Sequence, residues 1–218
     1  MIGVIDYQMG NLRSVLKAIE HVDAQAKVIS QPSELDDIER LILPGVGAFG
    51  DGMANLKQLG FDAKIKSYIK SGRPMLGICL GMQLLFDSSD EDAPSPGSPV
   101  TGLSLLPGKV VRFEGHAYGR GKLKVPHMGW NTIQWDRDDP LLRGVPQQAA
   151  VYFVHCYYCV PDQPQATASA MTDYGTSICA SLWRGNLWGT QFHPEKSQRI
   201  GLQMLANFAG ILCYRHRC

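Results

Sequence analysis

The chain has 218 residues, 44% of them hydrophobic, and nearly balanced charge, with 21 Lys and Arg against 20 Asp and Glu. This length allows one large domain, and the balanced charge gives no field that would attract nucleic acid or an anionic membrane. The first residues lack the positive segment of a secretory signal, and no stretch has the roughly 18 apolar residues of a membrane span. We therefore expect one cytoplasmic domain over residues 1–218, with reduced cysteines and no nucleic-acid or membrane partner.

The first 86 residues alternate between short apolar strands and helical patterns. Predicted strands cover residues 1–5, 26–29, 40–43 and 75–78. Predicted helices cover 51–59, 61–71 and 80–86, and an earlier one is capped by Asn11, with apolar residues from Leu12 to Val22 at helical spacing. This alternation favours a parallel sheet covered by helices on both faces.

The rest of the chain has a different pattern. Residues 87–99 are acidic and rich in Pro and Ser, so we expect a surface loop without chemistry of its own. A final helix capped by Ser197 would bury a face that includes Ile211 and Leu212. Predicted strands cover 109–113, 122–125, 131–135, 151–158, 166–171, 178–183 and 187–192, the last two joined by a hairpin turn at Gly185-Asn186. The expected fold class is α/β, with an open twisted mixed sheet flanked by helices.

Gly77-Ile78-Cys79-Leu80-Gly81 lies between the fourth strand and the helix after it. Small residues on both sides of Cys79 suit a nucleophile elbow, a sharp strand-to-helix turn that brings neighbouring backbone close. The start of a helix favours a thiolate, and its free N–H groups can hold an oxyanion. A buried structural cysteine beside two loop glycines is the alternative, and partners elsewhere must decide.

Gln191-Phe192-His193-Pro194-Glu195 follows the last strand, where an open α/β sheet places its ligands. His193 and Glu195 point to the same side of an extended chain, so the carboxylate can orient an imidazole that faces a thiol. Taken alone, this segment would suit a surface turn. With the elbow it predicts a Cys-His-Glu triad.

A glycine-rich loop, residues 44–50, follows the third strand. It lacks the Lys and Ser or Thr of a phosphate-binding loop, so it is either a structural turn or the source of a second oxyanion donor.

These motifs together resemble the class I (triad) glutamine amidotransferases. The residues concerned are Pro44-Gly45-Val46-Gly47, Gly77-Ile78-Cys79-Leu80-Gly81-Met82-Gln83 and His193-Pro194-Glu195. The resemblance implies a flavodoxin-like sheet with a nucleophile elbow. Further stretches at 6–15, 126–131, 152–155 and 193–197 are similar to the glutaminase subunits of imidazole glycerol phosphate synthases. The sequence departs from that branch at Gln8, where glycine is more frequent, and at Cys156, where serine or threonine is frequent.

The resemblance implies a glutaminase with no metal or cofactor, whose Cys79 attacks glutamine while His193 moves the proton and Glu195 orients the imidazole. The oxyanion would lie between the N–H of Leu80 and that of Val46 or Gly47. By resemblance, glutamine is held by Gly45, Gly47, Gln83, Cys156 and Tyr157. Ammonia would pass to a cyclase subunit, a (β/α)8 barrel that makes imidazole glycerol phosphate and aminoimidazole carboxamide ribotide in histidine biosynthesis. The residues matching positions at that interface are Asn11, Met128, Trp130, Tyr152 and Lys196.

Other functions remain open from the sequence. A different triad amidotransferase, a γ-glutamyl hydrolase or a cysteine peptidase could use the same elbow, and a non-catalytic regulatory module could keep the fold. Such a module would tolerate a lost triad residue, whereas all three are present. Cys156 and Cys159 have the spacing of a redox or zinc pair, but in a strand their thiols would face opposite sides. The C-terminal tail carries Cys213, His216 and Cys218, for which no fourth metal ligand is evident.

Overall fold

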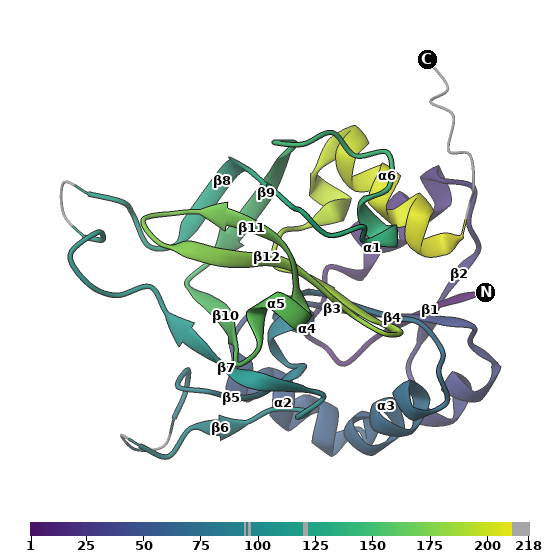
Figure 1. Ribbon diagram of the computed structural model, residues 1–218. Helices are drawn as coiled ribbons and strands as arrows, with labels where there is room; N and C mark the ends of the chain where they lie inside the picture. Colours follow the sequence, from purple (N-terminus) through teal and green to yellow (C-terminus); the bar gives the residue numbers. More distant parts are fainter. Residues whose placement is uncertain (94, 96, 120–121, 211–218) are drawn as a thin grey trace.

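Figure 1 shows the computed structural model, which describes residues 1–210 except 94, 96, 120 and 121. The central sheet has seven strands in the order β11-β12-β13-β4-β3-β1-β2. The five strands from β13 to β2 are parallel, whereas β11 and β12 are antiparallel additions at one edge. Its strands are β1 Ile2–Ile5, β2 Ala26–Ile29, β3 Arg40–Gly45, β4 Met75–Cys79, β11 Ala168–Asp173, β12 Ser177–Arg184 and β13 Leu187–Thr190. The predicted open mixed sheet is confirmed.

Helices cover both faces of this sheet, so its central strands are buried (Figure 1). Helices α2 (Phe49–Gln58) and α3 (Phe61–Lys70) pack on one face, and α1 (Leu12–His21) and α6 (Gln198–Ala209) on the other. The shorter helical segments are α4 Leu80–Gln83, α5 Pro164–Thr167 and the 3₁₀ turns η1 Pro32–Asp37, η2 Pro140–Leu142 and η3 Pro194–Lys196. Among the described residues, no helix has the length and apolar character needed to cross a bilayer.

Two smaller sheets extend beside the central one (Figure 1). One has the order β10-β7-β5-β6, and the other is the antiparallel pair β8-β9. Their strands are β5 Phe86–Ser89, β6 Val100–Thr101, β7 Leu106–Arg112, β8 His127–Thr132, β9 Ala150–His155 and β10 Tyr157–Pro161. The chain passes from one small sheet to the other at Cys156, between β9 and β10.

Some predicted elements were wrong. The strand expected at 122–125 is only a single bridge between Tyr118 and Leu123, and the one expected at 131–135 lies earlier, as β8. The helix expected at 80–86 ends at Gln83, because the chain turns directly into β5, which pairs with β7. The expected 87–99 loop therefore begins as a strand. One predicted strand, 151–158, is divided at Cys156 into β9 and β10.

The expected caps of two helices are also absent. Neither Asn11 nor Ser197 makes a side-chain capping bond. The Ser197 hydroxyl instead donates to the His193 carbonyl (2.7 Å) and accepts from the Tyr152 N–H (3.0 Å), which fixes the segment after β13. The remaining predicted residues of the last helix, Ile211 and Leu212, and the tail cysteines lie outside the described residues.

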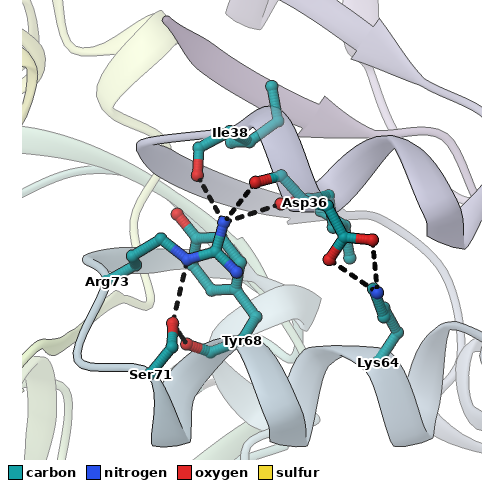
Figure 2. Close-up of polar contacts among 7 residues, drawn as sticks. Asp36, Ile38, Lys64, Tyr68, Ser71 and Arg73 are labelled. Atoms are coloured by element: carbon teal, nitrogen blue, oxygen red, sulfur yellow. Dashed lines mark hydrogen bonds and ion pairs between the residues drawn. The ribbon is translucent and has the colours of Figure 1, made fainter.

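The N-terminal end of β4 is anchored by a cluster around Arg73 (Figure 2). One guanidinium nitrogen of Arg73, Nη1, donates to the carbonyls of Leu35 (2.9 Å), Asp36 (3.1 Å) and Ile38 (2.9 Å), while its Nε donates to Ser71. The guanidinium also lies 4.1 Å from the centre of the Tyr68 ring. These contacts tie the start of β4 to η1 and the end of α3, so the strand enters the sheet in a fixed position.

Candidate active site

Cys79 lies at the sharp turn between β4 and α4. Its backbone has φ of 54° and ψ of −109°, a conformation that L-residues rarely adopt. A methyl group at Gly77 would lie 2.6 Å from the Gly81 carbonyl oxygen, and one at Gly81 would overlap the Leu43 carbonyl. Only glycine fits at these two positions, which is the reason for the Gly-x-Cys-x-Gly spacing. The strained residue is also the side chain presented to the cavity, as a nucleophile elbow requires.

The predicted triad partners lie beside the elbow, because β13 pairs with β4 and the chain after β13 carries His193. The His193 Nδ1 lies 2.7 Å from the Glu195 Oε1, and both side chains are almost fully buried. Burial lowers the pKa of His193, but its contacts with Cys79 and Glu195 raise it more, to about 10. The imidazole therefore favours its charged form, and an imidazolium stabilises a neighbouring thiolate.

The His193 Nε2 makes no hydrogen bond of standard geometry within the described part of the chain, although Cys79 is close enough to raise the imidazole pKa. The two groups are therefore neighbours that are not yet aligned for proton transfer. Such loose geometry is common before substrate binds.

Two buried glutamines lie behind the sulfur. Gln191 donates from Nε2 to the Cys79 Sγ at 3.8 Å, and its Oε1 accepts from the Gln83 Nε2 at 3.1 Å. The same Gln83 nitrogen also donates to the Tyr157 carbonyl at 3.0 Å. Gln83 was expected to hold glutamine, but both of its amide hydrogens are already used within the protein. Sequence reasoning assigned no role to Gln191, although it lies two residues before His193.

The triad opens into a cavity of about 410 Å³, a size suited to a small metabolite. The residues that line it are Val46, Gly47, Cys79, Leu80, Gln83, Glu91, Pro126, Val154, His155, Cys156, Tyr157, His193 and Lys196. Most of the predicted substrate contacts are thus brought together. Gly45 is the exception, because a methyl group there would meet Tyr7 and lie 2.8 Å from the Leu80 Cβ. Gly45 therefore packs against Tyr7 and Leu80 behind the residues that line the cavity, and is not itself among the lining residues.

Glu91 is a cavity residue that sequence reasoning missed. Its Oε2 accepts the Phe49 N–H at 2.9 Å, so the start of α2 holds the carboxylate in place. Burial raises the pKa of Glu91, and the bond from Phe49 partly opposes that shift. A carboxylate held in a cavity suits a ligand ammonium group. The acidic segment 87–99 gave no sign of this, because one glutamate among several acids has no distinctive spacing.

The glycine-rich loop after β3 supplies only part of the expected oxyanion site in this conformation. The Val46 N–H donates to the Met9 carbonyl at 2.6 Å, so it is not free to meet a developing negative charge. The expectation for Val46 is thus not met here. Leu80 is the first residue of α4, whose first N–H groups have no partner one turn earlier. Gly47 has φ of 104° and lines the cavity.

A larger cavity, about 780 Å³, lies elsewhere and is lined by residues between Gln134 and Met171. Its lining has several amide side chains but no thiol, and no imidazole that could activate the Ser169 hydroxyl. The smaller cavity, with the buried and charge-coupled triad, is the candidate active site.

The amino-acid sequence matches the family described as glutamine amidotransferase class-I over residues 3–211. The chain belongs to the class I glutamine amidotransferases. It is 50% identical to the imidazole glycerol phosphate synthase subunit HisH of Syntrophotalea carbinolica, over 95% of this chain and 98% of that protein. It is 48% identical to the subunit of the same name from Geobacillus kaustophilus, over 97% of each chain. The resemblance drawn from the three motifs is confirmed.

Solved structures with much lower identity share the fold. The structure of PurLQS from Thermotoga maritima matches with a TM-score of 0.73 and 18% identity, over 97% of this chain and 98% of that one. A glutamine amidotransferase from the same organism matches with a TM-score of 0.61 and 16% identity, over 95% of each chain. At these identities the likeness concerns the fold alone.

An exposed apolar surface on β8 lies near the candidate active site. Met128 and Trp130 on β8 are 62% and 49% exposed, unusual for large apolar side chains. The rings of Trp130 and Tyr152 lie 6.0 Å apart, and the Lys196 Nζ is 5.9 Å from the centre of the Tyr152 ring. Because Lys196 also lines the cavity, this surface reaches the mouth of the candidate active site.

The fifth residue expected at an interface, Asn11, precedes α1. That helix packs beside η3, the turn that contains Lys196. Asn11 thus lies at the start of an element that adjoins the same region.

Proposed function

We propose that this chain is the glutaminase subunit of an imidazole glycerol phosphate synthase, which releases ammonia from glutamine for a cyclase partner in histidine biosynthesis. The observation that carries the proposal is the placement of Cys79 and His193 in the lining of a cavity of about 410 Å³, with the buried Glu195 bonded to the far side of the His193 ring. Relatives near 50% identity that bear the HisH name support the choice of synthase. The proposal also places the enzyme in the cytoplasm, where the Cys79 thiol stays reduced.

In the proposed reaction, the Cys79 sulfur attacks the side-chain amide carbon of glutamine. The His193 Nε2, which makes no hydrogen bond of standard geometry among the described residues, carries the proton that the departing ammonia takes up. Glu195 holds the other ring nitrogen at 2.7 Å and thereby fixes the orientation of the imidazole. Water then cleaves the thioester to glutamate and restores the thiol.

In the proposed pose, the α-ammonium group of glutamine lies on the Glu91 carboxylate, its α-carboxylate lies against the chain at Cys156 and Tyr157, and its side-chain amide reaches Cys79. The oxyanion of the tetrahedral intermediate is stabilised by the Leu80 N–H and by an N–H of the loop that contains Gly47. Since the Val46 N–H is bonded to the Met9 carbonyl, full stabilisation at that position needs the loop to turn.

Ammonia released into water at neutral pH would be protonated and lost as a nucleophile. Ammonia must therefore reach its acceptor without exposure to solvent. By the family resemblance, the proposed partner is a cyclase of (β/α)8 barrel form that covers the mouth of the cavity. The exposed Met128, Trp130 and Tyr152 surface, together with Asn11 and Lys196, is the proposed docking site.

The direct test is Cys79→Ala in the complex with the cyclase. We expect glutamine-dependent synthesis to be lost while ammonia-dependent synthesis by the partner persists, which shows that the cyclase is intact. Copurification of the Cys79→Ala chain with the cyclase checks that the complex still assembles. The wild-type chain should hydrolyse glutamine and not γ-glutamyl peptides, and it should be nearly inactive until the cyclase with its nucleotide substrate is added. Full activity of the free chain, or glutamine use by the Cys79→Ala complex, would overturn the proposal.

A further inference from the structure

A buried histidine pair connects the outer strand pair to the wall of the cavity. His127 on β8 and His155 on β9 are register partners, 3% and 6% exposed. The His127 Nδ1 lies 3.0 Å from the His155 Nε2, and the His155 Nδ1 lies 2.8 Å from the Tyr157 carbonyl oxygen. The proposed reaction uses neither imidazole, so their chemistry needs another explanation.

The partners of these rings fix the direction of every hydrogen bond. A carbonyl only accepts, so the His155 Nδ1 donates to Tyr157, and the His155 Nε2 must then accept from the His127 Nδ1. The His127 Nε2 in turn accepts from the Asn131 Nδ2 at 3.3 Å. Burial lowers the pKa of His127 to about 4 and that of His155 to about 3. Both rings are therefore neutral near pH 7, so each hydrogen bond keeps the same donor and acceptor. We call the bonds from Asn131 through His127 and His155 to Tyr157 the histidine hydrogen-bond series.

The inner end of the histidine hydrogen-bond series, the Tyr157 carbonyl, is connected to the nucleophile Cys79. The Tyr157 carbonyl accepts from both His155 (2.8 Å) and Gln83 (3.0 Å), so two side chains hold it on the cavity wall. Gln83 and Gln191 continue the series of bonds to the Cys79 sulfur. A shift at Tyr157 would therefore alter both the substrate wall and the support behind the thiol.

The outer end of the hydrogen-bond series, at His127 and Asn131, lies on β8 beneath the exposed side chains of Met128 and Trp130. Along β8, Met128 and Trp130 face outward, whereas His127 and Asn131 point to the protein side. The His127 ring is stacked between Phe153, with centroids 4.6 Å apart, and Tyr174, with centroids 3.9 Å apart. The His127 ring is thus held firmly by its packing. A displacement of β8 by a partner bound to its outer face would therefore displace His127 as well.

We propose that His127 and His155 are positioning residues that transmit the placement of β8, set when a partner docks on Met128 and Trp130, to the Tyr157 carbonyl in the glutamine cavity. This inference rests on the proposed function, since it assigns a role in stimulation by the cyclase. The rings act through hydrogen bonds of fixed direction and do not exchange protons with substrate.

Two substitutions of His127 separate the hydrogen bond from the packing. His127→Phe keeps the stack between Phe153 and Tyr174 but removes the donor to His155. His127→Asn loses the stack but places an amide N–H where the Nδ1–H was. Each complex with the cyclase is assayed for glutaminase activity with and without the cyclase's nucleotide substrate, and for the KM of glutamine. The stimulation ratio is independent of how much protein is folded, so a loss of stability alone does not change it.

We expect His127→Phe to lower the stimulation ratio about tenfold, the effect of one buried hydrogen bond, and His127→Asn to stay within about threefold of wild type. Copurification with the cyclase, unchanged in both, checks assembly. If His127→Phe does not fold, Asn131→Ala decides, because it removes the donor to the His127 Nε2, and it should lower the ratio about threefold.

The inference is overturned if His127→Phe keeps both the ratio and the KM of glutamine within about twofold, if His127→Asn loses as much as His127→Phe, or if a folded Asn131→Ala keeps the full ratio. A wild-type complex that shows no stimulation would instead overturn the proposed function itself.

Discussion

Strand β4 begins at Met75 among satisfied hydrogen bonds and ends at Cys79 among polar atoms that lack them. At its start, the Met75 N–H donates to the Asn186 carbonyl, and the Asn186 side chain donates to the carbonyls of Ile69 and Arg73. At its end, the His193 Nε2 and the Glu195 Oε2 have no partner within the described residues, although both atoms are buried.

The difference shows how one strand serves both stability and chemistry. Buried polar atoms without partners are unfavourable, and so is the φ of 54° at Cys79. Both persist because the rest of the strand is held in the sheet and its start is anchored at Arg73 (Figure 2). Substitutions near Cys79 should therefore lower activity with little effect on stability. Substitutions near the start of β4 should lower stability with little effect on activity.

Glu195→Gln should have the largest effect, on activity. A neutral amide no longer stabilises the imidazolium, so the pKa of His193 falls and kcat should drop by on the order of 10³-fold. The measurement is kcat at saturating glutamine in the stimulated complex, with the free energy of unfolding measured in parallel. A kcat within about tenfold of wild type would show that Glu195 is not needed to hold the charge on His193.

Arg73→Ala should have the opposite effect, because it removes the donor to the carbonyls of Leu35, Asp36 and Ile38. We expect the free energy of unfolding to fall by about 2 kcal/mol, because a charged donor is lost from two partly buried carbonyls and one exposed carbonyl. The kcat of the folded enzyme should stay within about twofold, since the triad lies at the far end of β4. Chemical denaturation and glutaminase assays provide the two measurements.

Lys64→Ala is the matched control in the same cluster (Figure 2). Lys64 forms a 2.7 Å ion pair with Asp36, whose side chain is 63% exposed. Exposed pairs contribute about 0–1 kcal/mol, so this variant should be nearly as stable as wild type. If Lys64→Ala destabilised the protein as much as Arg73→Ala, the anchor would be the ion pair and not the bonds to the carbonyls.

The sequence predicted those parts of the fold that depend on local patterns. The alternation of strands and helices, the elbow at Cys79 and the hairpin turn at Gly185-Asn186 all follow from spacing and turn chemistry. The break at Cys156 does not, because β9 and β10 form one apolar run and are divided only by pairing with different strands.

The site divides in the same way. The triad could be predicted because each residue has a motif around it. Glu91 and Gln191 could not, since their roles come from tertiary contacts with Phe49 and Cys79. The occupied Val46 N–H depends on a hydrogen bond to Met9, which no local pattern specifies.

The raised pKa of His193 also predicts how stability depends on pH. Its folded value of about 10 exceeds the ordinary value of 6.5, so the folded state binds its proton more tightly than the unfolded chain. This contribution is fully present below pH 6.5 and is lost as the pH rises toward 10. In denaturation series from pH 6 to 10, wild type should lose more stability than His193→Gln. Equal slopes for the two proteins would contradict a charged imidazole in the folded enzyme.

Gln8→Gly should have the smallest effect, a slight increase in the free energy of unfolding. Gln8 lies next to Met9, which contacts the glycine-rich loop of the candidate active site. Gln8 has φ of 68°, where a non-glycine residue is strained by about 1–2 kcal/mol. Glycine removes that strain but gains entropy in the unfolded chain, so we expect a net stabilisation of about 0.5–1 kcal/mol.

Asp23→Gly is the matched control for Gln8→Gly, at an exposed position with φ of 58°, and it should gain less because aspartate tolerates this conformation better. Gln8 precedes Met9, whose carbonyl holds the Val46 N–H. Relief of strain at Gln8 therefore favours the conformation in which Met9 holds the Val46 N–H, and unstimulated glutaminase activity should fall slightly in Gln8→Gly but not in Asp23→Gly. Equal stabilities and equal basal activities in the two variants would show that the strain at Gln8 has no link to the loop.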